Sequence, residues 1–420
     1  MNFSTSLVGA AGRRWGSQRG HRDWLLGQAY DLIDFYQRNC PDPRGGFYDL
    51  DELGQPLATG WPPGPEPARA LFATVRMVHC FAIAHLMGRP GADDIVDHGM
   101  KFLWDGHRDT VHGGYHWRTG YGGPVDASKQ AYGHAFVLLA AASAKSVGHP
   151  DADRLLDDAT NVLLDRFWEP EHGAAAEEFN ADWTPIAGYR GQNSNMHLTE
   201  ACMAAYEATG TVQYLDMARS IADLIINRKT RENDWRLPEH FHQDWRIDAD
   251  YDRDVFRPYG TTVGHWLEWS RLLLQLWELS GRPGDWSLEA AQTLFQKSIQ
   301  EGWDRKNGGF YFTLDWQGQP RDRDRYWWPC AEGIGAAAFL GKITGDAYYE
   351  EWYRRLWSWT DTHLIDHVEG GWYPQLGDDL KPKTDPWYGK PDMYHSFQAC
   401  LIPLLPTNGS VVHGLLHYDF

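Results

Sequence analysis

Apolar residues recur at intervals of three and four along several alanine- and leucine-rich stretches, the spacing of an α-helical face. Four of these stretches are apolar nearly all round, which indicates buried helices: Ala131–Ala144, Met196–Ala208, Trp266–Leu279 and Ala331–Leu340. Each is followed by a stretch with a one-sided apolar pattern and outward charges: Leu155–Phe167, Tyr214–Ile226, Leu288–Trp303 and Tyr348–Leu364. The pattern therefore predicts helix pairs, each with a buried inner and a half-exposed outer member.

A glycine-containing aromatic turn follows a helical segment at intervals of roughly sixty to seventy residues. The turns are Gly45-Gly46-Phe47-Tyr48, Gly113-Gly114-Tyr115, a degenerate His172-Gly173-Ala174, a glycine-free equivalent around Glu239-His240-Phe241, Gly308-Gly309-Phe310-Tyr311 and Gly370-Gly371-Trp372-Tyr373. Repeated helix pairs close naturally into a ring, because an open array leaves both ends of its apolar face in water. We therefore predict an all-α fold, an (α/α)6 barrel with short β-hairpin-like aromatic turns at one mouth. The alternative is an open solenoid, whose repeats are usually nearer 35–45 residues.

No low-complexity linker interrupts the repeats, so we expect residues 1–420 to form a single catalytic domain. The proline-rich stretch Gly60–Pro67 is too short for a linker. It is either a rigid loop over one barrel mouth or a surface loop without a role.

The chain is acidic, with a formal net charge of -18, and its basic residues are scattered. This argues against nucleic acid and anionic membranes as partners. The N-terminal stretch Met1–Gly12 has no basic segment before its apolar residues, and no apolar run approaches the length of a membrane span. We expect a soluble cytoplasmic protein and a possible homo-oligomer. The cysteines, Cys40, Cys80, Cys202, Cys330 and Cys400, lack metal or redox spacing and are expected to be buried free thiols.

The aromatic content is high, with 22 tryptophans, 20 tyrosines and 17 phenylalanines. Most of these rings must pack between helices, but aromatic faces in a cavity also bind the C–H faces of sugar rings. A small carbohydrate is therefore the favoured kind of ligand.

Polar residues recur in register near the predicted starts of the inner helices, where they should converge at one mouth. They are Arg76, Tyr132 with His134, Asn193 with His197 and Glu200, His265 with Glu268, Trp328 with Glu332, and Asp392 with His395. A set of polar residues at repeat spacing predicts a functional site.

His197 with Glu200, and His265 with Glu268, share a spacing of three. Each pair should lie on one helical face, with the carboxylate able to orient the imidazole. A histidine held in this way keeps a defined tautomer and suits general acid–base catalysis. A lone histidine on an apolar helix is more often structural, but His265 and His395 occupy equivalent repeat positions, which favours catalysis for these two.

Other chemistries remain open at this point. Imidazoles at one mouth could hold zinc or manganese, and the His-x-x-Glu spacing permits this, although the di-iron pattern runs in the other order, Glu-x-x-His. A metal is not required by these residues. Glycoside hydrolysis would need two carboxylates flanking a cleft, for which Glu332, Glu268 and Glu200 are available. A ring that only binds protein would not need polar residues in register.

Ordered stretches across nearly the whole chain carry a resemblance to a known family. They are Gly88–Gly91, Val96–Gly99, Val125–Gln130, Asn193–Glu200, Gly264–Trp269 and Asp392–His395. They resemble the N-acylglucosamine 2-epimerase superfamily, most closely its branch of aldose–ketose isomerases, which comprises D-mannose isomerase and sulfoquinovose isomerase. The resemblance implies an (α/α)6 barrel that acts on a monosaccharide without metal, nucleotide or redox cofactor.

The resemblance also implies roles for individual residues. His395 is similar to the residue that moves a proton between C1 and C2 of the open-chain sugar, and His265 to its acid–base partner, which assists ring opening. Arg76 resembles the contact to the sugar oxygens of a cis-enediol intermediate, and Glu268 the support of His265. The expected substrate-binding residues are Asn193, His197, Tyr132, Trp328, Glu332 and Phe72, the last in place of a matching tryptophan.

Departures from the pattern bear on the substrate. Resemblance to sulfoquinovose isomerase would call for an arginine and two glutamines where this chain has Val255, Pro374 and Pro391. A sulfonate would have little to hold it, so a neutral hexose is expected. We expect interconversion of D-mannose and D-fructose, and of D-lyxose and D-xylulose. The alternatives are 2-epimerisation of mannose to glucose, sulfoquinovose isomerisation and, more remotely, glycoside hydrolysis.

Overall fold

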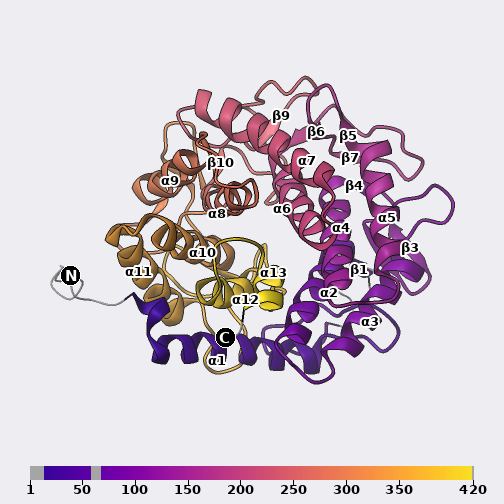
Figure 1. The fold of residues 1–420 in the computed structure, drawn as a ribbon, viewed down its shortest axis with the longest axis horizontal. Helices are drawn as coiled ribbons and strands as arrows, with labels where there is room; N and C mark the ends of the chain where they lie inside the picture. Colours follow the sequence, from indigo (N-terminus) through magenta and orange to yellow (C-terminus); the bar gives the residue numbers. More distant parts are fainter. Residues whose placement is uncertain (1–13, 58–67, 419–420) are drawn as a thin grey trace.

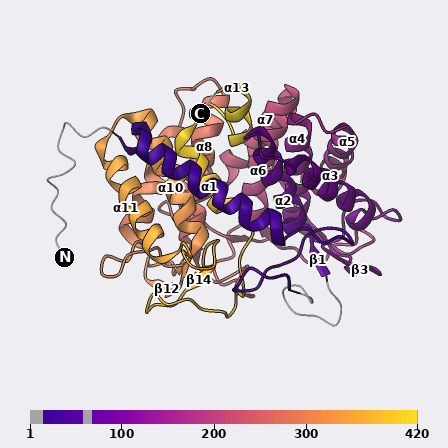
Figure 2. The ribbon, with the colours of Figure 1, turned by 90° about the horizontal axis from the view of Figure 1, so that it is seen from below.

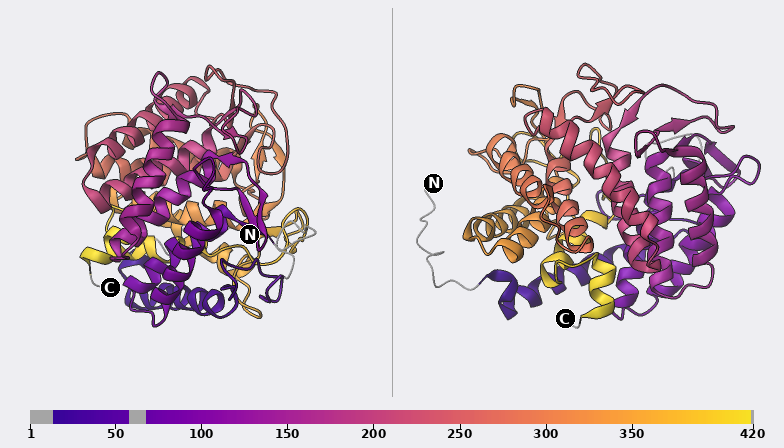
Figure 3. Two further views of the ribbon diagram at one scale, coloured as in Figure 1. Left: turned by 90° about the vertical axis from the view of Figure 1, so that its right-hand side faces the viewer. Right: turned by 45° about the horizontal axis from the view of Figure 1, so that its top comes forward.

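The computed structural model describes residues 14–57 and 68–418, whose helices form a closed ring of two concentric layers (Figure 1). The first outer helix, α1, lies beside the last inner helix, α12, so the beginning and end of the ring meet. Figure 3 shows the same ring from its side and with its upper edge brought forward. Closure of this kind buries the apolar faces of all the pairs, as the repeat pattern predicts.

The inner layer of the described ranges consists of six helices: α2 (Leu71–Leu86), α4 (Ala131–Ser146), α6 (Gln192–Thr209), α8 (Val263–Leu279), α10 (Trp327–Thr344) and α12 (Tyr394–Leu401). The outer layer consists of α1 (Arg19–Asn39), α3 (Ala92–Phe102), α5 (Ala152–Val162), α7 (Val212–Ala222), α9 (Ser287–Lys297) and α11 (Ala347–His363). The predicted inner and outer segments fall on these helices, so the (α/α)6 architecture is confirmed. Inner helices are buried nearly all round, and outer helices on one face.

Four outer helices continue into a π-helical turn: Leu103–His107 after α3, Leu163–Phe167 after α5, Asp223–Thr230 after α7 and Ser298–Gly302 after α9. Short 3-10 turns cover Trp15–Ser17 and Ile402–Leu404, and the last helix is α13 (Val411–His417).

Short antiparallel strands gather at one end of the ring, and α13 lies at the other (Figure 2). Two sheets are three-stranded: β1 (Ala68–Ala70), β2 (Arg118–Gly120) and β3 (Gly123–Asp126); and β10 (Thr261–Thr262), β11 (Thr313–Leu314) and β12 (Pro320–Asp322). The others are pairs: β4 (Lys129–Gln130) with β7 (Glu178–Phe179), β5 (Trp168–Glu169) with β6 (Ala174–Ala175), β8 (Arg190–Gly191) with β9 (His240–Phe241), and β13 (Arg325–Tyr326) with β14 (Gln375–Leu376). Four of the predicted aromatic turns are closed by isolated antiparallel bridges, and β5 with β6 closes the third. The bridges are Pro41–Phe47, Arg108–Tyr115, Trp303–Phe310 and Ile365–Trp372.

The glycine pairs of the turns adopt a backbone that other residues rarely accept. Gly308 and Gly309 have φ angles of 80° and 77°, and a Cβ on either would lie within 2.6 Å of a neighbouring side chain. Both features require glycine. The sequence pattern of the aromatic turn therefore reports a real backbone constraint.

A buried ion pair recurs at the strand end and fixes where inner helices begin. In five repeats of the described chain, an acid just after the outer helix pairs with a base just before the next inner helix. The pairs are Asp42–Arg69, Asp109–Lys129, Glu169–Arg190, Asp304–Arg325 and Asp366–Lys390. A buried charge must be paired, so each pair holds the first turn of an inner helix at a set position.

The five cysteines are free and buried, as predicted, and burial raises the pKa of each thiol. Within the described ranges no helix has the length and apolarity needed to cross a membrane. The proline-rich stretch Gly60–Pro67 lies outside the described residues, so its suggested place over the mouth stays a prediction. So does a single domain over residues 1–420.

Candidate active site

The N-terminal halves of the inner helices bring most of the predicted site residues into one network of contacts toward the strand end. Five of these helices directly follow a short strand, and α12 follows a segment that an isolated bridge joins to Leu50, so their first turns face the mouth. The residues in contact are Arg76 on α2, Tyr132 on α4, His197 and Glu200 on α6, His265, Glu268 and Arg271 on α8, Trp328 and Glu332 on α10, and Tyr394 and His395 on α12.

His265 is held by a carboxylate from the glycine-free fourth turn. Its Nδ1 donates to Glu239 Oε2 at 2.9 Å, and the amide of Gln192 donates to the same oxygen at 2.8 Å. The backbone N–H of Thr262 donates to the other oxygen of Glu239 at 3.0 Å. Burial opposes ionisation of Glu239, but the charge of His265 and its hydrogen bond lower the carboxyl pKa overall. An ionised Glu239 fixes the proton of His265 on Nδ1 and leaves Nε2 free for a substrate.

His395 is held in the same way from the neighbouring inner helix. Its Nδ1 lies 2.8 Å from Glu332 Oε1, and Arg271 Nε donates to Glu332 Oε2 at 2.7 Å. Burial raises the carboxyl pKa of Glu332, but Arg271 and His395 outweigh it and lower that pKa overall. Burial lowers the pKa of His395, and Glu332 opposes this. His395 is therefore a neutral imidazole with Nε2 free, the form required of a general base.

The indole of Trp328 lies between the two histidines. Its ring centroid is 5.0 Å from that of His265 and 5.8 Å from that of His395, with interplanar angles of 36° and 37°. Trp328 therefore presents an apolar surface beside both free Nε2 atoms, which suits the C–H face of a sugar.

Arg76 provides the positive charge of the mouth. Its Nη1 pairs with Asp392 at 3.0 Å, and its Nη2 donates to the hydroxyl of Tyr132 at 2.7 Å. Asp392 also accepts the backbone N–H of Tyr394, beside His395. One carboxylate thus ties the guanidinium to the start of the helix that carries His395.

Deeper in the ring, buried carboxylates surround Arg271. Its Nη2 lies 3.6 Å from Glu200 and 3.8 Å from Glu268, in addition to the bond from Nε to Glu332. Burial, together with the charges of Glu332 and Glu200, raises the pKa of Glu268 well above its usual value. Burial also raises the pKa of Glu200, but His197 and Arg271 reverse this and lower it overall. Glu268 is therefore the neutral member of the cluster.

Two groups of these side chains have the spacing of metal ligands, His197 with Glu200 and Glu268, and Glu268 with Glu332 and His395. Arg271 already supplies positive charge to Glu200 and Glu332, Glu268 is neutral, and His395 is engaged with Glu332. The arrangement is balanced as an ion-pair network, and these residues do not fit a metal well.

The structure corrects the expected partner of His265. The carboxylate that contacts it is Glu239, whereas Glu268 Oε1 lies 3.6 Å from His197 Nδ1. Three residues along a helix correspond to a rise of about 4.5 Å, so Glu268 reaches the layer below His265. His197 lies between Glu200 at 3.7 Å and Glu268, and burial lowers its pKa to about 4.

Three further residues noted in the sequence, Phe72, Asn193 and His134, lie in different surroundings. Phe72 packs near Tyr132, with ring centroids 6.2 Å apart, and so lines the same mouth. Asn193, on the first turn of α6, has a buried Oδ1 without a hydrogen-bond partner among the described residues. His134 has a structural role, because it accepts the N–H of Tyr115 and donates to Gln130 O, joining an aromatic turn to α4.

The sequence interpretation missed Glu239, Gln192 and Arg271 as site residues. Glu239 had a signal, since it stands where the fourth turn lacks the glycine pair of the other repeats. Arg271 follows Glu268 by three residues, so it lies on the same helical face as His265 and Glu268, further along the buried helix. A buried arginine beside acids on one helical face is a feature that the spacing could have revealed.

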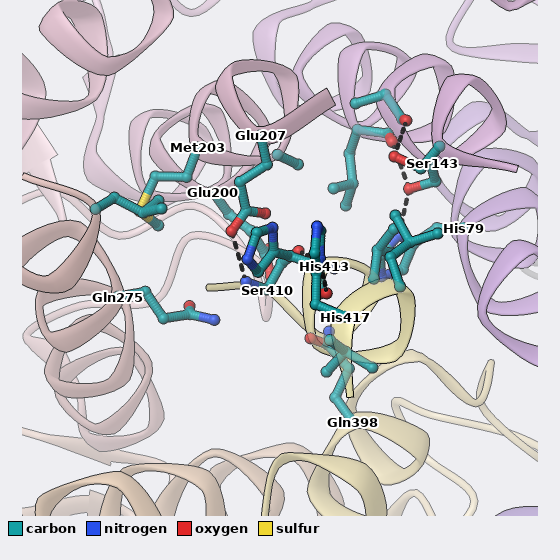
Figure 4. A pocket seen from close by; sticks show the side chains of 18 residues that line it. His79, Ser143, Glu200, Met203, Glu207, Gln275, Gln398, Ser410, His413 and His417 are labelled. Carbon is teal, nitrogen blue, oxygen red and sulfur yellow. Dashed lines mark hydrogen bonds between the residues drawn. The ribbon is translucent and has the colours of Figure 1, made fainter. Parts of the chain in front are cut away.

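A separate cavity lies at the α13 end of the ring, below this network (Figure 4). It is about 50 Å³ in volume and is lined by His79, Glu200, Glu207 and Gln398, among others. Neither His265 nor His395 lines it. Glu200 therefore separates the mouth network from this cavity.

The fold and the site are those of a helical-barrel enzyme that acts on sugars, with two histidines at one mouth. The N-acylglucosamine 2-epimerase (GlcNAc 2-epimerase) family model matches residues 16–399, and the chain belongs to this family. It is 43% identical to D-mannose isomerase of Thermobifida fusca over 408 residues, 96% of this chain and 98% of that protein. It is 40% identical to D-mannose isomerase of Pseudomonas cannabina pv. alisalensis, over 96% of this chain and 98% of that one.

Solved structures of known sugar isomerases and epimerases superpose on this chain. A crystal structure of D-mannose isomerase superposes with a TM-score of 0.84 at 33% identity, covering 91% of this chain and 97% of that one. A cellobiose 2-epimerase from Spirochaeta thermophila DSM 6192 superposes with a TM-score of 0.80 at 23% identity, covering 92% and 96%, and shows the shared fold. The predicted family and fold are confirmed.

Proposed function

We propose that this protein interconverts D-mannose and D-fructose, and D-lyxose and D-xylulose, by transfer of a proton between C1 and C2 through a cis-enediol. The observation that carries the proposal is the pair of histidines, each held through Nδ1 by a buried glutamate on either side of Trp328. Two relatives named D-mannose isomerase, at 43% and 40% identity, support it for the sugar.

In this mechanism His395 Nε2 takes the proton from C2 of the open-chain aldose and returns it to C1. Glu332 stabilises the imidazolium that forms in between, since it accepts the Nδ1 proton of His395 at 2.8 Å. Such a positioned base contributes roughly 10²–10⁴-fold to the rate. His265, oriented by Glu239, assists ring opening and then moves the hydroxyl proton from O2 to O1, so that the enediol becomes the ketose.

Arg76 stabilises the oxygen that becomes negative in the enediolate. Its guanidinium is buried and stays charged, and its Nε has no hydrogen-bond partner among the described residues. A charge-assisted hydrogen bond from a buried guanidinium acts where charge develops. Asn193 Oδ1, also without a partner in the described structure, is available for a sugar hydroxyl. His197, Tyr132, Phe72 and Glu332 complete the proposed substrate surroundings.

The test is incubation with D-mannose, D-glucose, N-acetylmannosamine and sulfoquinovose, with chromatographic separation of the products. We expect fructose from mannose and slower conversion of lyxose to xylulose. In heavy water, deuterium should enter the product at the reprotonated carbon. Glucose formed from mannose before fructose would make the protein a 2-epimerase. Turnover of sulfoquinovose alone would contradict the interpretation of Val255, Pro374 and Pro391.

A further inference from the structure

Two aromatic side chains are in contact although they come from different parts of the ring, each on a segment that leads to the start of an inner helix. Phe256 lies in the segment between β9 and β10, and Trp387 in the segment between β14 and α12. Their ring centroids are 4.9 Å apart, with an interplanar angle of 74°. We call this contact the aromatic bridge. The repeat that carries α10 separates the two segments in sequence, so the bridge spans the mouth edge instead of joining adjacent turns.

The segment that carries Phe256 is anchored close to the site. Tyr251 stacks on Tyr189, with centroids 4.7 Å apart. Arg257 Nη2 pairs with Glu178 at 3.0 Å, and Pro258 O accepts His240 Nε2 at 2.8 Å. Phe256 therefore extends from a fixed backbone, and it remains 59% exposed at the outer surface.

The opposite segment is also fixed. Lys390 forms a buried ion pair with Asp366, and its backbone N–H donates to Leu50 O at 3.0 Å. A Cβ on Gly389 would lie 1.8 Å from Leu50 O, so the backbones are in close contact there. Trp387 is thereby held against the start of α10.

The aromatic bridge connects directly to the catalytic residues. Trp387 lies 6.1 Å from Trp327, ring centroid to centroid, and Trp327 lies 6.4 Å from His395. Below the histidines, the ring is filled by Arg271 and its carboxylates. A sugar with C1 and C2 at the histidines must therefore direct its remaining carbons toward the mouth, where the bridge lies.

We propose that the aromatic bridge of Phe256 and Trp387 is a specificity determinant that admits an unsubstituted monosaccharide and excludes a sugar extended by a second residue at O4. This deepens, and rests on, the proposed isomerase function. The bridge acts by occupying the space that the second sugar would need, and it makes no contact with the reacting carbons. Val255, where the chain departs from the sulfonate-binding pattern, is the residue beside Phe256.

The experiment compares kcat/KM for D-mannose and for β-1,4-mannobiose in the parent, Phe256→Ala and Trp387→Ala. Ile186→Ala, on another exposed residue, is the matched control. We expect the parent to prefer mannose by about a hundredfold, the size of discrimination that pocket contacts provide. Each bridge variant should raise kcat/KM for the disaccharide roughly tenfold and leave that for mannose within about threefold. Phe256→Trp, which keeps the bridge, should retain the exclusion.

Equal use of both sugars by the parent, or no change in their ratio in either folded bridge variant, would overturn the proposal. A second readout does not depend on turnover. Binding of D-mannitol and of reduced mannobiose, followed by tryptophan fluorescence, should show the same change in ratio. A parent that converts no monosaccharide contradicts the isomerase function, whereas an unchanged binding ratio contradicts the aromatic bridge. Thermal unfolding of each variant establishes that it is folded.

Discussion

Glu239 Oε2 accepts a hydrogen bond from Nδ1 of His265 at 2.9 Å. Glu239 lies on a turn, 26 residues before His265 in the sequence. The same relationship recurs between Glu332 and His395 at 2.8 Å. Both imidazoles are thus oriented across the barrel wall, and His265 is not oriented by Glu268, the acid three residues further along its own helix. Orientation from a neighbouring repeat leaves each Nε2 pointing away from its supporting acid.

Glu239→Gln should lower kcat by about 10²-fold or more, because it removes the charge that fixes the tautomer of His265. Glu268→Gln should cost much less, since the raised pKa of Glu268 makes it a neutral carboxylic acid that an amide mimics. Steady-state kinetics on both variants makes the comparison. A larger loss in Glu268→Gln than in Glu239→Gln would restore Glu268 as the support of His265.

His395→Ala should lower the rate by about 10²–10⁴-fold, because it removes the base that transfers the C2 proton. Folding and sugar binding should survive, since the side chain bonds only through Nδ1 to Glu332 in the described structure. Circular dichroism and a titration with mannitol check both points. Near-parental turnover in this variant, together with inactivity of His265→Ala, would exchange the roles of the two histidines.

Much of the fold follows from the sequence because its signals are local. Three- and four-residue spacing places helices such as Ala131–Ser146, and the glycine pairs mark turns with positive φ. The starts of inner helices converge in any closed ring, so polar residues at repeat positions locate the mouth. These inferences need no knowledge of which turn faces which.

The contacts inside the site could not be predicted in the same way. Helical spacing correctly places His265 and Glu268 on one face, but it does not say that Glu268 reaches the layer of Arg271 and His197. The acid at the height of His265 comes from another segment, at a sequence separation of 26. Only the closed arrangement of the ring determines such pairs.

Arg76→Lys should not restore the activity lost on removing Arg76. The guanidinium contacts Asp392 through Nη1 and Tyr132 through Nη2 at the same time, which the single ammonium of lysine cannot reproduce. We expect kcat/KM to fall by at least about tenfold, the cost of one charge-assisted hydrogen bond. If Arg76→Lys retained the parental kcat/KM, the role of Arg76 would be structural.

Dialysis against a chelator should leave the isomerase rate unchanged. Glu200 and Glu332, which belong to the groups with metal-ligand spacing, already have a cationic partner in Arg271, so the proposed steps use protein groups alone. The rate is measured before and after dialysis, with zinc or manganese added back as the control. A loss that either metal restores would contradict a mechanism based only on histidines.

The folded protein should lose stability as the pH falls below about 6.5, because several buried histidines remain neutral in it. Burial lowers the pKa of His107 and His134 to about 3, and that of His79 and His197 to about 4. The unfolded chain takes up these protons from about pH 6.5 downward, whereas the folded chain does so only near the lowered values.

Stability is therefore fully present above about pH 6.5 and is lost progressively toward pH 4, by about 1.4 kcal/mol per histidine per pH unit. Urea unfolding at about pH 7, 6 and 5 measures the loss. His134 accepts the N–H of Tyr115 through Nε2, which therefore cannot carry a proton in the folded protein. His134→Gln should remove the contribution of one histidine from the slope of the unfolding free energy against pH. A free energy of unfolding that stays constant between pH 7 and 5 would show that these histidines titrate alike in both states.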